Sequence, residues 1–107
     1  MDFNHFLTSY MPDLSIGSKT HFQNMIDQAI LAEKLGYKTV SIPEHHLVNL
    51  LMMPSPLQMA VKIATLTKKI NISTSVVVLP LHDMRTYAGE VATADILTDG
   101  RLILGVG

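Results

Sequence analysis

The chain has 107 residues, of which 48% are hydrophobic, and its eight basic and nine acidic side chains leave a formal net charge of −1. This length suits one compact unit with a core of its own but is small for a typical catalytic domain. The near-neutral charge offers no basic surface to a phosphate backbone, so we expect no nucleic-acid partner. The absence of cysteine excludes a disulfide scaffold, a thiol nucleophile and a cysteine metal site.

The sequence also carries no membrane or export signal. No stretch approaches the roughly 18 consecutive apolar residues that a membrane-spanning helix needs. Residues 1–5 lack the positive start and apolar run of a signal peptide. We therefore expect a soluble, cytoplasmic protein with no membrane partner. Its mean hydropathy of +0.29 is high for such a protein, which indicates that a partner or further chain covers part of the surface.

The first half of the chain predicts a strand, a helix and a second strand. Residues 3–10 are typical of a short strand that ends at a turn around Pro12. From about residue 18 to residue 35 the apolar positions follow helical spacing, and Gly36 is well placed to end that helix. Residues 38–42 are short and β-branched, as in a buried strand.

The second half repeats this alternation. Ser55 as N-cap and Pro56 at the first helical position predict a helix over 55–67. Residues 70–79 contain a continuous apolar run, typical of a strand covered on both faces. Asp83 predicts the start of a helix over 83–97, and residues 101–106 predict a fourth strand. Asp95 falls on the apolar stripe of the last helix, so we expect Arg101 to pair with it.

The resulting order, β-α-β-α-β-α-β with a period of about 30 residues, predicts an α/β fold with a parallel sheet. Both a small, open, doubly wound sheet and part of a (β/α)8 TIM barrel share this order. A barrel needs about 250 residues, and four strands make half of one. Because no helix follows the last strand to cover it, we favour the N-terminal half of a barrel. Residues 1–107 then form one partial domain, truncated after strand four.

Ligands of parallel sheets bind at the carboxyl ends of the strands, which makes Glu44-His45-His46 the strongest candidate site. Such a run supplies a proton acceptor and a residue to orient it, although one imidazole packed and one solvated is the alternative. A metal site from His45, His46, His82 and Asp83 is conceivable. We expect none, because adjacent residues rarely turn to one metal and no HxH or HExxH spacing occurs.

Other candidate residues surround this loop. His5 lies on the same strand face as Leu7, where it either lines the floor of a site or packs in the core. The apolar stretch 47–53 suggests a wall for a hydrophobic substrate or a subunit contact. Within it we assign Leu47, Leu51 and Met52 to a substrate pocket. The small residues 73–75 either let a flat ring approach the backbone or make room for packing.

Five segments in order, covering essentially the whole chain, resemble the N-terminal part of the bacterial luciferase-like flavin monooxygenases. They are Ala32-Glu33-Lys34-Leu35-Gly36-Tyr37, Pro43-Glu44-His45-His46, Thr67-Lys68-Lys69-Ile70-Asn71, Val77-Val78-Leu79-Pro80 and Asp99-Gly100-Arg101-Leu102. The resemblance implies a (β/α)8 barrel that binds reduced FMN or, in some branches, a deazaflavin. It further implies oxidation of a small, hydrophobic organic substrate by O2, with a separate flavin reductase as partner.

The resemblance also implies roles for single residues. His45, the first imidazole of the Glu44-His45-His46 run, would give acid–base help at the flavin. The residues Thr74, Ser75 and Val76 would lie beside the flavin ring, with a cis peptide bond between Ser75 and Val76. A homodimer, or another self-association, would form through the helices at 55–67 and 83–97. The residues that bind the flavin phosphate would lie beyond residue 107.

Two functions follow as expectations. The first is the N-terminal portion of a flavin-dependent monooxygenase, inactive as these 107 residues alone. The second is a non-enzymatic half barrel that acts as an assembly module with itself or with another half barrel, because an incomplete barrel leaves two open sheet edges.

Overall fold

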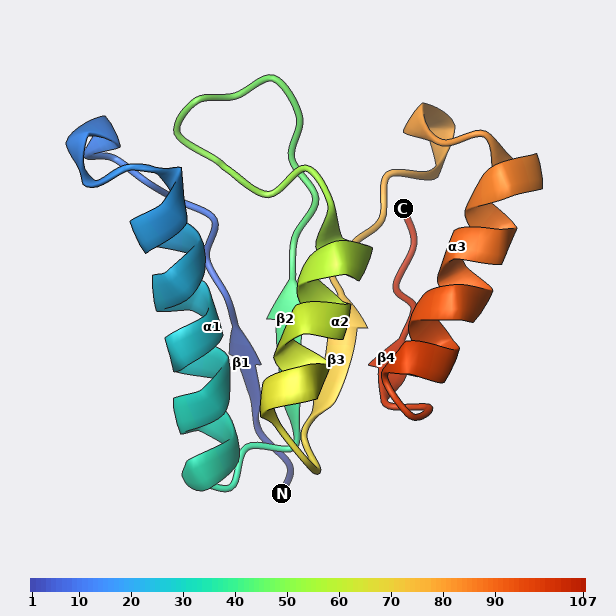
Figure 1. The fold of residues 1–107 in the computed structure, drawn as a ribbon, viewed down its shortest axis with the longest axis horizontal. Coiled ribbons are helices and arrows are strands. Elements are labelled where there is room, and N and C mark those ends of the chain that lie inside the picture. The colour runs from blue at the N-terminus through green and yellow to red at the C-terminus, as the bar shows by residue number, and fades with distance from the viewer.

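The computed structural model describes all 107 residues, as a four-stranded parallel sheet with its three long helices on one face (Figure 1). The strands are β1 (Asn4–Phe6), β2 (Thr39–Ile42), β3 (Asn71–Thr74) and β4 (Leu102–Ile103), and the helices are α1 (Ser18–Lys34), α2 (Pro56–Leu66) and α3 (Met84–Leu97), with short 3-10 turns η1 (Leu14–Ile16) and η2 (Leu79–Leu81). This order confirms the predicted alternation.

The sheet order β1-β2-β3-β4 follows the chain, and every neighbouring pair is parallel. A doubly wound sheet would reverse its strand order at a switch point and place helices on both faces. Neither feature is present, because α1, α2 and α3 all lie in front of the sheet in Figure 1. The arrangement is therefore that of successive units of a (β/α)8 barrel.

Strand register separates a packed face from an open one. Val40 pairs with Ile72, and both are fully buried in the main core beneath the helices. The next register row, Phe6, Ser41, Ser73 and Ile103, alternates to the opposite face, which carries no helix. There Phe6 is 50% exposed and Ile103 is 47% exposed. The open face corresponds to the interior of a barrel.

Helix boundaries agree with their local signals. Gly36 has φ +86° just past the end of α1, a conformation that favours glycine at a helix C-terminus. Ser55 precedes α2 with Pro56 at its start, although the Ser55 hydroxyl makes no capping bond. Asp83 caps α3 by accepting a hydrogen bond from the N–H of Arg85. These residues fix the chain reversals that bring each strand back into the sheet.

Two predictions about the second half were wrong. The predicted strand 70–79 ends at Thr74, and Val77 makes only an isolated bridge to Val106, because the backbone turns at a cis peptide bond between Ser75 and Val76. That cis bond itself is the one that the family resemblance predicted. Arg101 does not pair with Asp95, which is exposed; its guanidinium instead donates to carbonyl groups at the C-terminus of α2.

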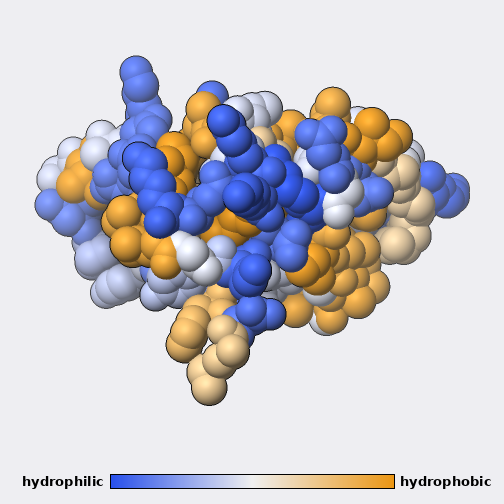
Figure 2. Space-filling model, turned by 90° about the horizontal axis from the view of Figure 1, so that it is seen from below, coloured by the Kyte–Doolittle hydropathy of each residue, from blue (hydrophilic) through white to orange (hydrophobic).

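Hydrophobic side chains reach the surface at many places. Figure 2, a view from the end of the molecule at which the strands begin, shows them on both sides of a hydrophilic centre. The most exposed ones on the three long helices are Ile96 at 74%, Leu97 at 56% and Leu31 at 53%. No helix combines the length and the apolar character needed to cross a membrane.

Candidate functional site

The loops that follow the strands gather at one end of the sheet, the upper end in Figure 1. The loop 43–55 folds over the end of β1, where Leu51 forms an antiparallel bridge with Tyr10. The N–H of Met52 donates to the carbonyl of Ser9 at 3.0 Å. Ser9 is 2% exposed, and its hydroxyl has no hydrogen-bond partner. Backbone pairing between the loop 43–55 and the segment after β1 therefore forms the rim of this end of the sheet. The unpaired Ser9 hydroxyl lies beneath that rim.

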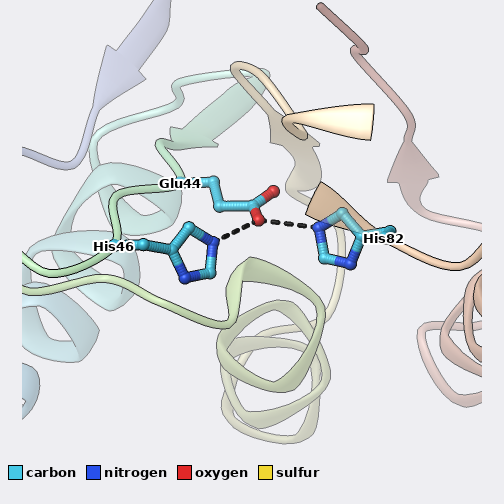
Figure 3. Close-up of side chains that lie close together, drawn as sticks. All are labelled: Glu44, His46 and His82. Atoms are coloured by element: carbon cyan, nitrogen blue, oxygen red, sulfur yellow. Dashed lines mark hydrogen bonds and ion pairs between the residues drawn. The ribbon is translucent and has the colours of Figure 1, made fainter. Parts of the chain in front are cut away.

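Glu44 is the centre of the candidate site. Its carboxylate lies between two imidazole rings from different loops (Figure 3). The Nε2 atoms of His46 and His82 lie 2.6 Å and 2.7 Å from the same oxygen, Oε1. The other oxygen, Oε2, accepts the N–H of Val78 at 2.9 Å. Glu44 thus joins the loop after β2 to the segment after β3.

The electrostatics of this cluster favour an ionised carboxylate. Burial of Glu44 opposes ionisation, but hydrogen bonds from His46, the Val78 N–H and His82 outweigh it and hold the pKa of the carboxyl below its usual value. Because an ionised carboxylate only accepts hydrogen bonds, both Nε2 atoms carry the donated proton. When these rings are neutral, their basic nitrogen is therefore Nδ1.

Tyr87, on α3, supports this cluster from the side. Its ring stacks on His82 with centroids 4.0 Å apart and 28° between the planes. Burial, together with the negative charges of Glu44 and Glu90, raises the pKa of Tyr87 to about 12. Tyr87 is 4% exposed, and its hydroxyl has no hydrogen-bond partner. The stacking fixes the plane of the His82 ring.

His45 stays outside the cluster. Its backbone N–H donates to the carbonyl of Met53 at 2.9 Å, while its half-buried side chain makes no hydrogen bond. Of the predicted run, the structure therefore joins Glu44 and His46 and leaves His45 apart. The third member, His82, is a candidate by its position after the strand next to β2, but the sequence analysis gave it no role other than that of a conceivable metal ligand.

Two of the predicted pocket residues do not line a pocket here. His5 Nε2 lies 3.1 Å from the side-chain oxygen of Gln28 on α1, so the ring faces the helices and not the open face of the sheet. His5 is only partly buried and packs between β1 and α1. Leu47 is fully exposed, with φ +58°, at the tip of the loop. Leu51 and Met52 are half-buried at the rim.

Of the residues expected beside a flavin ring, Thr74 is engaged in hydrogen bonds, whereas Ser75 and Val76 are exposed. The Thr74 hydroxyl is fully used, because it donates to the carbonyl of Gly105 at 2.8 Å and accepts the Gly105 N–H at 2.9 Å. Thr74 therefore fastens the end of β3 to the chain after β4. Ser75 is exposed and Val76 is 42% exposed. The Ser75 carbonyl and the Val76 N–H make no hydrogen bond within the chain.

Gly105 is a residue whose role the sequence analysis missed. A Cβ atom at this position would lie 2.2 Å from the Thr74 carbonyl oxygen, which is far inside contact distance. Gly107 is also tight, since its Cβ would lie 2.7 Å from a Val76 methyl group. The Gly105-Val106-Gly107 sequence thus permits close approach of two backbones at the exposed Ser75–Val76 peptide.

The luciferase-like monooxygenase family model matches residues 1–107. The chain belongs to this family. Among curated relatives, protein y4vJ of Sinorhizobium fredii is 38% identical over the whole chain, which spans 30% of that relative. The oxygenase component of a flavin-dependent trigonelline monooxygenase from Acinetobacter baylyi is 32% identical over 82% of the chain and is covered to 24%. An alkanal monooxygenase alpha chain of Photorhabdus luminescens is 29% identical, and the match covers 99% of this chain and 29% of that relative. The chain thus spans less than a third of these relatives.

Solved structures of luciferase-like monooxygenases and related enzymes share the fold. The oxygenating constituent of a 3,6-diketocamphane monooxygenase from Pseudomonas putida, in complex with FMN, superposes with a TM-score of 0.92 at 23% identity. It is matched over 100% of this chain and 29% of its own. A coenzyme F420-dependent reductase from Methanopyrus kandleri superposes with a TM-score of 0.77 at 20% identity. The match covers 99% of this chain and 26% of that one. The α/β fold therefore matches the N-terminal part of these TIM-barrel enzymes, whose cofactors are FMN in one case and F420 in the other.

Proposed function

We propose that these residues supply the N-terminal strands of a flavin-dependent monooxygenase that uses reduced flavin and O2 to oxidise a small, hydrophobic organic substrate. Family membership supports the reaction class. The observation that carries the proposal is the position of the buried Glu44, with two imidazoles bonded to it, at the carboxyl ends of the strands. Active sites of (β/α)8 barrels lie at that end.

The chain fits a flavin ring at the Ser75–Val76 peptide. This peptide is exposed, its two polar groups have no partner within the chain, and the Gly105 backbone packs directly beneath the adjoining Thr74 carbonyl. An exposed amide edge can bond to the polar edge of a planar heterocycle while the neighbouring side chains pack on its face. Reduced FMN, or alternatively a deazaflavin, would supply the electrons for the oxidation when bound there.

His45, Glu44 and His46 divide the acid–base work in this proposal. The His45 side chain is half-buried and makes no hydrogen bond, so it is free to hold or release a proton at a reacting group. Glu44 fixes the orientation of His46 through the bond from Nε2 to Oε1.

Apolar side chains at the rim support a hydrophobic substrate. Leu51 and Met52 are half-buried next to the end of β1. Methionine and leucine shape an adaptable apolar wall. Leu47 contributes to that wall only if another segment of the complete barrel covers the loop tip, because it is fully exposed in this chain.

Two kinds of protein partner belong to the proposal. A separate reductase would deliver the reduced flavin, and the trigonelline relative is itself named as an oxygenase component. A second copy of the chain would pack on the groove between α2 and α3. This groove has a volume of about 920 Å³ and is lined in part by Leu57, Val61 and Leu97. Leu97 is 56% exposed in this groove, and cover from a second copy would remove its side chain from water.

The assembly-module alternative draws support from the open face of the sheet. Phe6 and Ile103 are about half exposed there, and both sheet edges are unpaired. A second half barrel could cover that face and pair with those edges. Reduced-flavin binding separates the two functions, because an assembly module has no need of it.

Isotopically labelled O2 tests the proposed reaction in a full-length form of the protein. The enzyme is first titrated anaerobically with reduced FMN or reduced deazaflavin, then mixed with labelled O2 and a medium-chain aldehyde or ketone. We expect saturable flavin binding and a product that carries one labelled oxygen atom. A product without the label, or no saturable binding of either flavin, would contradict the proposal.

A further inference from the structure

We propose that Glu44, His46 and His82 form a binding site for a divalent transition-metal ion. One carboxylate oxygen and two imidazole nitrogens from these residues all lie within 4.8 Å of one another. The ligands come from two loops, at the ends of β2 and β3, which the parallel sheet holds side by side (Figure 3). The proposed site shares Glu44 and His46 with the proposed oxygenase function but includes neither His45 nor the Ser75–Val76 peptide, so a failure of metal binding is distinguishable from a failure of flavin binding.

The donor set selects the kind of ion. Two imidazoles and one carboxylate suit Zn²⁺, Co²⁺ and Fe²⁺, whereas Ca²⁺ and Mg²⁺ prefer oxygen ligands alone. Three protein ligands leave at least one position for water, as in metal sites that are open to a substrate. The side chains of His46 and His82 are 32% and 20% exposed, so water and the ion have access to the cluster.

The surrounding contacts hold the ligands in place before an ion arrives. The Glu44 side chain is fully buried, and its second oxygen is fixed by the Val78 N–H. The stacking of Tyr87 on His82 fixes the plane of that ring. Such contacts around the ligands raise metal affinity because less side-chain freedom is lost on binding.

The buried carboxylate of the cluster has no lysine or arginine beside it. The Glu44 side chain is fully buried, and its ion-pair partners are the two histidines. A divalent cation bound there would place positive charge directly beside this carboxylate.

Ion binding requires the ligand atoms to move, because the short N···O distances widen and ligand atoms that now lie up to 4.8 Å apart draw together. Ligand atoms bonded at about 2.0–2.2 Å to one ion lie about 3.0–3.4 Å apart in octahedral or tetrahedral geometry. The two N···O distances of 2.6 Å and 2.7 Å must therefore widen by a few tenths of an ångström. Each neutral ring moves its proton from Nε2 to Nδ1, which turns Nε2 from a donor into a ligand.

The structure also separates this site from the metal set considered in the sequence. Asp83 is engaged elsewhere, because its carboxylate caps α3 and pairs with the guanidinium of Arg85. His45 does not bond to the cluster. In the proposed site Glu44 is the ligand in place of Asp83 and His45, because the rings of His46 and His82 both reach its buried carboxylate.

Titration with Co²⁺ tests the proposal directly, because its visible absorption reports coordination. We expect one saturating ion per chain and absorption bands typical of nitrogen and oxygen ligands. His46→Gln and His82→Gln should each weaken binding by at least about tenfold, the lower end of effects seen at metal sites. His5→Gln, an imidazole on the helix-covered face, should change it by less than about twofold.

The circular dichroism of each variant shows whether it is folded. Glu44→Gln should also lose the ion, and if that variant unfolds, the two histidine variants decide. In nitrogen NMR, addition of Zn²⁺ to the wild type should move the protonated nitrogen of two rings from Nε2 to Nδ1. The absence of a saturable stoichiometric site, or an equal loss of affinity in His5→Gln and His82→Gln, would overturn the proposal.

Discussion

At the residue scale, two charged side chains brace the end of the sheet that lies opposite the candidate site. The carboxylate of Glu33, in the last turn of α1, accepts the backbone N–H groups of Lys68, Lys69 and Ile70 at 2.7–3.0 Å. Arg101 donates to the Ala64 carbonyl at 2.7 Å from the other side. Together they fasten the loop between α2 and β3, which sets where β3 begins.

Glu33→Gln should destabilise the fold and flatten its acid dependence. Burial raises the pKa of Glu33, but the three backbone hydrogen bonds and the charge of Arg101 outweigh it and hold the pKa below its usual value of 4.5. A lowered pKa stabilises the folded state above 4.5, and that stability is lost as the pH falls through the folded value. We expect a loss of about 1–3 kcal/mol near neutral pH, measured by urea unfolding.

Asp27→Asn, on the exposed side of the same helix, is the matched control for Glu33→Gln. Asp27 accepts one hydrogen bond from Gln23, which an asparagine oxygen can also accept. Its unfolding free energy should follow the wild type at every pH. Parallel pH profiles for the wild type and Glu33→Gln would show that Glu33 does not stabilise this loop.

At the element scale, β3 and the chain after β4 meet through a backbone contact that only glycine permits. The Cβ of an alanine at position 105 would lie 2.2 Å from the Thr74 carbonyl oxygen, and backbone atoms cannot yield as a flexible side chain can. Gly105→Ala should therefore lower the free energy of unfolding by about 1–3 kcal/mol or more. Gly89→Ala, inside α3 with nothing near its Cβ, should instead raise it by about 0.5–1 kcal/mol.

The two glycine variants are compared by thermal and urea unfolding. Equal effects in the two variants would contradict the role of Gly105 in close packing. The same contact also holds the exposed Ser75–Val76 peptide against β4. In a full-length form, Gly105→Ala should thus also weaken reduced-flavin binding, whereas Gly89→Ala should not.

Local signals predicted the elements well, because helix spacing, Gly36 and Asp83 act over a few residues. The strand 70–79 was predicted too long, since the apolar run 76–79 does not reveal that Val76 is exposed at a turn. Arg101 was paired with Asp95, six residues away, although it reaches carbonyl groups more than 30 residues away. Contacts between distant segments depend on the packed sheet, which a local pattern does not describe.

The same distinction applies to the candidate site. The Glu44-His45-His46 motif lies, as the strand-end rule predicted, in the loop that follows β2 at the carboxyl end of the sheet. The order of residues along the chain does not tell which ring turns toward Glu44. In the structure His46 and His82 share the carboxylate, while His45 lies apart. The pattern of apolar residues on α3 likewise did not predict that the Tyr87 hydroxyl lacks a hydrogen-bond partner or that its ring stacks on His82.

At the scale of the whole molecule, the exposed apolar surface predicts association. We expect the protein to be a dimer in light scattering after size exclusion, with the groove between α2 and α3 at the interface. Leu97→Asp places a charge in that groove, where Leu97 is 56% exposed, and should weaken the dimer by at least about tenfold. Leu31→Asp, 53% exposed on α1 and away from the groove, should leave it unchanged. A concentration-independent monomer, or equal effects of both changes, would contradict this interface.

Substitution of His45 tests the central claim, that the loop after β2 performs acid–base chemistry in flavin-dependent oxygenation. In a full-length form, His45→Ala should lower turnover by about a hundredfold to ten-thousandfold, the usual contribution of an acid–base residue. The dissociation constant of reduced flavin should change little, because His45 does not belong to the Ser75–Val76 peptide, where the flavin ring is proposed to bind. His5→Gln, whose ring faces α1, serves as the control and should keep wild-type turnover. Unchanged turnover in His45→Ala, with flavin bound normally, would contradict the account.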